Sequence, residues 1–146
     1  MADMPSQPDS DHPIRRRGAV AVVLREKRFL VIRRSAHVVA PGAFCFPGGG
    51  IEADETEAQA LVREFREELG AGIAPLRRVW QSTTLWQVEL AWWLGHVEPG
   101  CPLVPNPAEV ESIHWLTRAE MLAQEQLLES NRTFLQALAE GRIVLD

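Results

Sequence analysis

Several features that would assign a chain to a particular class are missing from this sequence. Only two cysteines are present, Cys45 and Cys101, and they lack the CxxC spacing of zinc or redox sites, so we expect reduced thiols. No apolar run approaches the roughly 18 residues that a membrane span needs. The N-terminus has no apolar core, so we expect neither a secretory signal nor an anchor, and a cytoplasmic location follows.

Positive charge is also scarce. The chain carries 15 Lys and Arg against 20 Asp and Glu, which gives a formal net charge of −5. Binding a nucleic-acid backbone requires clustered Lys and Arg, so the charge balance argues against a nucleic-acid polymer as partner. A small phosphorylated substrate that carries a cation remains compatible with it.

The length of 146 residues corresponds to one globular domain with a tail. Hydrophobic residues make up 46% of the chain and charged residues 24%, which is close to the globular norm and supplies a sizeable core. The N-terminal segment is rich in Pro, Ser, Asp and Gln. We therefore expect a tail over residues 1–16 and a single domain over residues 17–146.

Hydrophobic patterning predicts a mixed α/β chain. The expected strands cover residues 19–24, 28–32, 78–84, 85–97 and 109–115. A dense set of Gly and Pro predicts loops over residues 35–50 and 98–107. The expected helices cover residues 56–69, a short segment that begins at the capping pair Thr117 and Glu120, and residues 130–140.

The helix expected over residues 56–69 has two chemically different faces. At 100° per residue, Glu64, Glu67 and Glu68 lie within an arc of about 100°, and Glu57 belongs to the same stripe one turn earlier. Like charges at this spacing destabilise a helix, so their clustering requires a cation, and hard carboxylate oxygens suit Mg²⁺ or Mn²⁺. We expect this acidic face to stay accessible while the apolar face packs. The apolar side chains are Ala58, Leu61, Val62, Phe65 and Leu69.

The loop before this helix runs Phe46–Pro47–Gly48–Gly49–Gly50–Ile51–Glu52. Its glycines allow the backbone to approach a ligand closely, and bare amides or carbonyls at such a place face phosphate or metal. An acidic helix face alone is usually only a solvated surface. The loop and the helix together favour a metal site.

Seven residues in this region resemble the Nudix box, G-x5-E-x7-R-E-U-x-E-E-x-G-U, in which U is a bulky apolar residue. They are Gly49, Glu55, Arg63, Glu64, Glu67, Glu68 and Gly70. The last U position holds Ala71, which is smaller than usual. The resemblance implies the Nudix α/β/α sandwich, with a mixed β-sheet flanked by the box helix and the C-terminal helices.

The resemblance also implies roles for individual residues. Those expected to bind the metal, the first through its carbonyl, are Gly48, Glu64, Glu67 and Glu68. Those expected to support the loop and the helix are Gly49, Glu55 and Arg63. The implied reaction is hydrolysis of a nucleoside diphosphate linked to another moiety, in which a carboxylate takes a proton from the attacking water. The carboxylate that acts as this base comes from the box helix, or it is Glu109 or Glu111. An alternative interpretation of Glu109 and Glu111 is that they are simply exposed residues of an edge strand.

The segment from Phe29 to Ser35, followed by Phe46–Pro47–Gly48–Gly49, resembles the MutT-type branch, which hydrolyses nucleoside triphosphates and often oxidised ones such as 8-oxo-dGTP. Arg33 or Arg34 is a candidate phosphate ligand. The alternative interpretation is that both are solvent-exposed charges at the end of a strand. Alternation along a strand lets only one of the two point toward the site. Trp86 is the candidate for stacking on the nucleobase.

Other activities remain open on the same scaffold. The chain has no tyrosine, whereas one type of diadenosine-polyphosphate hydrolase usually carries one downstream of the box. Dinucleoside-polyphosphate or nucleotide-sugar hydrolysis is the enzymatic alternative, and a non-catalytic nucleotide sensor is the alternative of a different class. Such sensors typically lose box glutamates, which are all present here. The sequence is compatible with a monomer or a homodimer.

Overall fold

The structure is a computed structural model that describes residues 16–146. The tail predicted over residues 1–16 therefore lies outside the described residues, except for Arg16. Arg16 is the first residue of the first strand. The exposed side chains of Arg16 and Arg17 form the polar entry of that strand.

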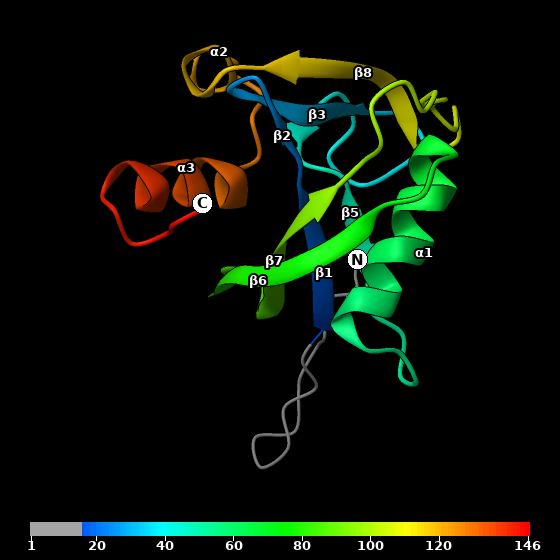
Figure 1. Ribbon diagram of the computed structural model, residues 1–146, viewed down its shortest axis with the longest axis horizontal. Coiled ribbons are helices and arrows are strands. Elements are labelled where there is room, and N and C mark those ends of the chain that lie inside the picture. Colours follow the sequence, from blue (N-terminus) through cyan, green and yellow to red (C-terminus); the bar gives the residue numbers. More distant parts are fainter. Residues whose placement is uncertain (1–15) are drawn as a thin grey trace.

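The helices and strands follow the order expected from the sequence (Figure 1). The strands are β1 (Arg16–Val22), β2 (Leu24–Arg25), β3 (Arg28–Arg34), β4 (Phe44–Cys45), β5 (Gly48–Gly50), β6 (Ala74–Thr83), β7 (Val88–His96) and β8 (Val110–Leu116). The helices are α1 (Glu57–Leu69), α2 (Arg118–Leu122) and α3 (Glu129–Ala139). The region 35–50, expected to be loop only, contains the two short strands β4 and β5.

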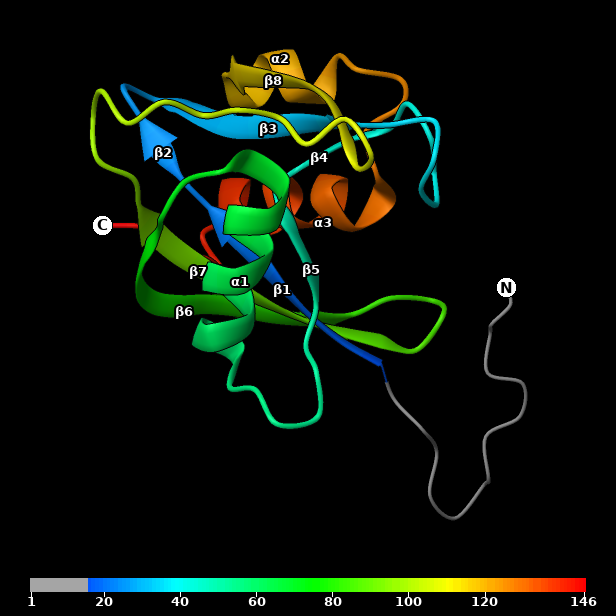
Figure 2. The same ribbon diagram turned by 90° about the vertical axis from the view of Figure 1, so that its right-hand side faces the viewer.

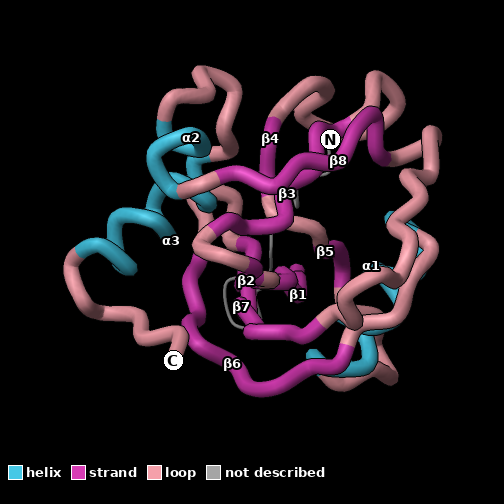
Figure 3. The backbone as a smooth tube through the Cα atoms, turned by 45° about the horizontal axis from the view of Figure 1, so that its top comes forward, coloured by secondary structure: helices cyan, strands magenta, loops and turns pink. Residues whose placement is uncertain are grey.

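The strands form two sheets. In the first the order is β5-β1-β7-β6, and in the second β3 pairs with β2, β4 and β8. Strands β1 and β7 run parallel, whereas β5 pairs with β1, and β6 with β7, in antiparallel register. The mixed sheet expected from the sequence is confirmed. Figures 2 and 3 show the β3–β8 pair lying apart from the sheet that holds β1 and β7.

Strand β1 is buried on both faces, which explains its nearly continuous apolar sequence. Ala19 and Ala21 belong to one apolar cluster with Phe65 of α1, whereas Val22 belongs to a second cluster with Phe134 of α3. Alternate side chains of a strand point to opposite faces, so one strand supports both helices. Figure 1 shows α1 and α3 on opposite sides of this strand, as an α/β/α sandwich requires.

Among residues 16–146, no helix combines the length and the apolar character that crossing a membrane demands. Both cysteines are free thiols, as the sequence predicts; Cys45 is buried and Cys101 is partly exposed.

Candidate metal centre

Helix α1 begins and ends where its sequence predicts. Thr56 accepts a hydrogen bond from the backbone amide of Gln59, and the Gln59 side chain accepts one from the Thr56 amide, which completes a capping box. Gly70 ends the helix in the left-handed conformation, with φ of 65°. These two ends fix which residues face the core, and therefore where the glutamates of α1 lie.

At two of its three glycines, Gly48 and Gly49, the backbone of strand β5 lies directly against other groups. A Cβ atom at Gly48 would overlap the carbonyl oxygen of Ala19 in the neighbouring strand, and one at Gly49 would overlap the carboxylate of Glu64. The amide of Gly48 donates a hydrogen bond of 3.0 Å to Oε1 of Glu68. The glycines thus bring the loop backbone into direct contact with the acidic face of α1.

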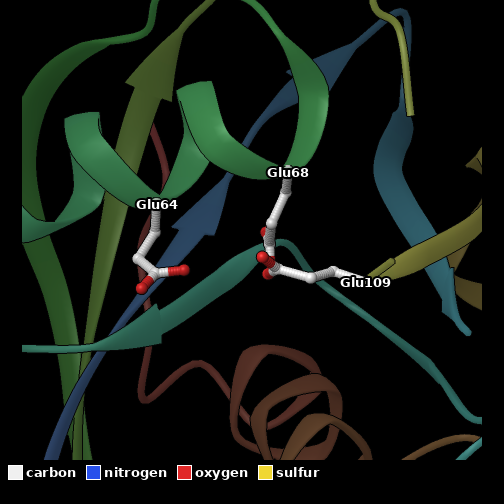
Figure 4. A group of neighbouring side chains, drawn as sticks. All are labelled: Glu64, Glu68 and Glu109. Atoms are coloured by element: carbon white, nitrogen blue, oxygen red, sulfur yellow. The ribbon is translucent and has the colours of Figure 1, made fainter. Parts of the chain in front are cut away.

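Three carboxylates meet beside this loop. Glu64 and Glu68 come from α1, and Glu109 comes from the turn immediately before β8 (Figure 4). One carboxylate oxygen of each lies within 4.8 Å of the others. Oxygen donors at this spacing suit a hard divalent cation such as Mg²⁺ or Mn²⁺, so these residues fit the metal that the sequence implies.

Burial shapes the electrostatics of the cluster. Glu68 is only 4% exposed. Burial, together with the neighbouring charges of Glu64 and Glu109, raises its pKa to about 8, against the opposing effect of the hydrogen bond from Gly48. Burial likewise raises the pKa of Glu64. A bound cation supplies the positive charge that would let these carboxylates ionise together.

The acidic face of α1 is less accessible than the sequence suggests. Its expected stripe includes Glu57, but this carboxylate accepts a hydrogen bond of 2.8 Å from Nε1 of Trp93 and pairs with Arg78 at 3.3 Å. Glu68 is buried because β5 packs directly on the helix. Helical periodicity identifies the face of a helix, but it does not show that a glycine strand covers part of that face.

Arg63 joins the loop to the helix. Its Nε and Nη2 atoms donate to the two carboxylate oxygens of Glu55 at 2.5 and 2.8 Å, and Nη2 also donates to the carbonyl of Gly50 at 2.9 Å. The hydrogen bonds from Arg63, followed by the bond between Glu55 and the Glu52 amide, lower the pKa of Glu55 to about 2. This bidentate contact fixes the loop that carries Gly48.

Glu67 lies outside the three-carboxylate cluster. Its side chain is 48% exposed, and its carboxylate lies 3.4 Å from Nη1 of Arg63. The same Arg63 nitrogen donates to Oε2 of Glu64 at 2.9 Å. Of the three helix glutamates expected to bind metal, the structure therefore brings two together and leaves the third in an ion pair beside them.

A β-bulge separates the two candidate bases. The register of β3 against β8 shifts between Arg33 and Arg34, which leaves Glu111 as an extra residue in β8. Glu111 lies 3.8 Å from Arg33 in an exposed ion pair, while Glu109 joins the carboxylate cluster. The geometry therefore favours Glu109 over Glu111 as a participant in the site.

The side chains of the adjacent residues Arg33 and Arg34 make different contacts. Arg34 donates to the carbonyl of Val39 at 2.6 Å, and its charge lowers the pKa of Glu68, so it lies on the side of the cluster. Arg33 donates to the carbonyl of Gly42 at 3.1 Å and lies over the ring of Phe44. Strand alternation predicts such a division, and the structure places Arg34 on the side of the cluster.

Trp86 lies at the tip of the β6–β7 hairpin and is 69% exposed. It lines a cleft of about 520 Å³ between this tip and the start of α3. Besides Trp86, the cleft is lined by hydroxyl-bearing and apolar side chains and by one carboxylate, that of Glu129. They are Ser82, Thr83, Thr84, Leu85, Leu128, Glu129, Ser130 and Thr133.

Sequence reasoning missed Asn131, which follows Ser130 of this cleft. Asn131 is buried, and its Oδ1 accepts a hydrogen bond of 2.8 Å from the amide of Phe46, two residues before Gly48. The available signal was a polar residue at a buried helical position between Leu127 and Phe134. Asn131 links the cleft to the loop of the carboxylate cluster.

The raised pKa of Glu68 predicts a pH-dependent stability of the metal-free protein. A carboxyl with a pKa of about 8 when folded and an ordinary value when unfolded binds more protons in the folded state. Its contribution to stability is complete below about pH 4.5 and is lost as the pH rises through 8. We expect urea unfolding in EDTA to show a lower free energy of unfolding at pH 8 than at pH 5.5.

Glu68→Gln is the control for this measurement, because its amide does not titrate. The pH dependence should be weaker in this variant, and saturating Mg²⁺ should reduce it in the wild type. An equal pH dependence in both proteins would contradict the assignment to Glu68.

Comparison with known proteins gives a consistent result. The NUDIX domain family model matches residues 14–138. The chain is 46% identical over 50 residues to a CTP pyrophosphohydrolase from Escherichia coli (strain K12), covering 34% of this chain and 37% of that protein. It is 34% identical over 88 residues to the NAD-capped RNA hydrolase NudC from Stutzerimonas stutzeri (strain A1501), covering 59% of this chain. The match spans 31% of NudC, so the matches cover only about a third of the length of each of these two relatives.

Solved structures show the same fold. A MutT NUDIX hydrolase from Burkholderia pseudomallei superimposes with a TM-score of 0.68 at 27% identity, over 84% of this chain and 97% of that one. A MutT protein from Methanosarcina mazei Go1 superimposes with a TM-score of 0.71 at 23% identity, over 87% of this chain and 94% of that one. Because the family model spans most of the chain and includes the glycine loop and the acidic helix, this chain belongs to the Nudix domain family.

Proposed function

We propose that this chain is a divalent-cation-dependent pyrophosphohydrolase that cleaves a nucleoside diphosphate linked to another moiety. The observation that carries this proposal is the meeting of Glu64, Glu68 and Glu109 within 4.8 Å of one another beside a glycine strand. The relatives named above support it, since they include a pyrophosphohydrolase and a hydrolase of capped RNA. A non-catalytic sensor would not need a buried acidic cluster of this kind.

The residues of the cluster have distinct proposed roles. Glu64, Glu68 and the carbonyl of Gly48 would hold the cation, and Glu67 would join them on leaving Arg63. When bound there, Mg²⁺ or Mn²⁺ would neutralise phosphate oxygens, stabilise charge on the leaving group and lower the pKa of the attacking water. A carboxylate oxygen of Glu109 accepts the proton of the attacking water.

The cleft beside Trp86 supports a nucleotide substrate. Its volume of about 520 Å³ lies within the roughly 300–1,000 Å³ typical of small-molecule sites. We place the base against the exposed ring of Trp86 and the phosphates at the carboxylate cluster, with Arg34 as a phosphate ligand. The contact between Asn131 and Phe46 connects these two places.

We favour a nucleoside triphosphate as substrate, including an oxidised one such as 8-oxo-dGTP. The CTP pyrophosphohydrolase and the MutT neighbour favour this choice over a dinucleoside polyphosphate or a nucleotide sugar. Discrimination between 8-oxo-dGTP and dGTP would depend on contacts to the altered base edge. Each good hydrogen bond contributes about 1–1.5 kcal/mol, or roughly tenfold in rate.

Product analysis tests the substrate and the reaction together. With Mg²⁺, a nucleoside triphosphate should yield the monophosphate and pyrophosphate. In ¹⁸O-labelled water, attack at the β-phosphorus, which we expect, would place the label in pyrophosphate, whereas label in the nucleotide would mark attack at the α-phosphorus. A panel with a nucleotide sugar and a dinucleoside polyphosphate is the comparison.

Two results would change this assignment. Release of orthophosphate alone, or turnover of a nucleotide sugar without turnover of any triphosphate, would favour the alternative substrates. Nucleotide binding without turnover of any member of the panel would favour the sensor.

A further inference from the structure

The turn that carries Glu109 is attached directly to the end of α1. The backbone amide of Asn106 donates to the carbonyl of Glu68 at 2.9 Å, and its side-chain Nδ2 donates to the carbonyl of Glu67 at 3.2 Å. Figure 2 shows the long segment between β7 and β8 passing over the end of α1. One residue therefore contacts the main chain of two of the box glutamates.

Asn106 also shapes the turn itself. Its Oδ1 accepts a hydrogen bond of 3.1 Å from the amide of Ala108, and its carbonyl accepts bonds of 2.9 and 2.7 Å from the amides of Glu109 and Val110. The amide group of this side chain thus uses its donor on the helix and its acceptor on the turn. Glu109 lies only three residues from this contact.

A second anchor holds the other side of the same turn. Ser35, which is buried after β3, donates from Oγ to the carbonyl of Ala108 at 3.0 Å. Its backbone amide donates to the carbonyl of Glu109, also at 3.0 Å. The main chain at Glu109 is therefore held between α1 and β3.

Electrostatics explains why such attachment is needed. One carboxylate oxygen of Glu68 and one of Glu109 lie within 4.8 Å of each other. Whenever both carboxylates are ionised, their repulsion drives Glu109 away from the helix. Among residues 16–146, no ion pair or hydrogen bond of the Glu109 side chain opposes this movement. The backbone contacts of the turn must therefore impose the position of Glu109.

We propose that Asn106 is a positioning residue that holds Glu109 against the carboxylates of α1. This inference rests on the proposed role of Glu109. Aspartate at this position keeps the acceptor for Ala108 but replaces the donor with an oxygen that faces the carbonyl of Glu67. Asn106→Asp therefore separates the contact with the helix from the contact within the turn.

The test compares Asn106→Ala and Asn106→Asp with Glu109→Gln and with the double variant Asn106→Ala/Glu109→Gln. Displacement of a reacting group by about 1 Å costs up to 100-fold, so we expect kcat to fall about 10- to 100-fold in both Asn106 variants, with KM unchanged within about threefold. In the Glu109→Gln background, Asn106→Ala should cause less than about a threefold further loss. Gln124→Ala is the matched control, because the Gln124 amide donates to the carbonyl of Glu120 in α2.

The Mn²⁺ dissociation constant, measured by electron paramagnetic resonance without substrate, provides a readout besides activity. Because the carboxylate of Glu109 lies within 4.8 Å of those of Glu64 and Glu68, both its loss in Glu109→Gln and its displacement in Asn106→Ala should weaken Mn²⁺ binding. Circular dichroism should show that all variants fold. Asn106→Asp takes the place of the alanine variant in the cycle if the latter fails to fold.

The outcomes are distinguishable. Wild-type kcat in Glu109→Gln would contradict the proposed role of Glu109 and, with it, this inference. If Glu109→Gln lowers kcat and Asn106→Ala lowers it by the same factor in the Glu109→Gln background as in the wild type, the two residues act independently. That result would overturn the inference about Asn106 and leave the proposed role of Glu109 intact. Wild-type kcat in both Asn106 variants would do the same.

Discussion

Replacing Glu68 with glutamine is expected to lower kcat/KM at least about 10³-fold while the protein remains folded. The substitution removes a charged ligand from the carboxylate cluster, and a thousandfold loss corresponds to about 4 kcal/mol of transition-state stabilisation. Folding should survive because the glutamine oxygen can still accept the hydrogen bond that the Gly48 amide donates to Glu68. Steady-state kinetics over a range of Mg²⁺ concentrations, with circular dichroism of each protein, measures both effects.

Two further variants test whether the loss is specific to the proposed metal ligands. Glu67→Gln should cause a comparable loss if Glu67 leaves Arg63 to join the cation, as proposed above. Glu125→Gln is the control, since Glu125 is an exposed glutamate outside the cluster. Metal-dependent turnover at the wild-type rate in Glu68→Gln would remove the basis for the metal site.

Glu109→Gln should lower kcat by roughly 10²–10⁴-fold with little change in KM, which is the range for loss of a positioned general base. The expectation follows from the position of Glu109 in the cluster with Glu64 and Glu68. Single-turnover kinetics would show whether the chemical step is the one that slows.

Glu111→Gln is the matched control for that experiment. The two glutamates are two residues apart, but Glu111 is the bulge residue and pairs with Arg33. Its substitution should change kcat by less than about threefold, because the ion pair is exposed and contributes little. The reverse result, with a large loss only in Glu111→Gln, would move the role of general base to Glu111.

The box helix could be predicted closely because its signals are local. The capping pair Thr56 and Gln59, the apolar period and the final Gly70 act within one segment, and α1 begins and ends accordingly. The same applies to the short helix that begins after Thr117. Local signals also locate the break between β6 and β7, which the sequence places near Thr84.

The assembly of the cluster could not be predicted in the same way. Which of Glu109 and Glu111 approaches α1 depends on a one-residue bulge between β3 and β8, which is a property of pairing between distant segments. The burial of Glu68 depends on β5 packing over it. The cleft beside Trp86 joins a hairpin tip to a helix more than 40 residues later in the chain.

The two-sided burial of β1 has a consequence for how this centre tolerates mutation. Ala19 and Ala21 of the strand and Ala60 of the helix are fully buried in the same apolar cluster. Three methyl groups therefore set how closely α1 approaches the sheet that also holds the glycine strand. Adding even one or two methylene groups to a close-packed interior forces backbone shifts. The spacing of the acidic ligands is thus encoded partly in side-chain volume, at positions that touch neither substrate nor ion.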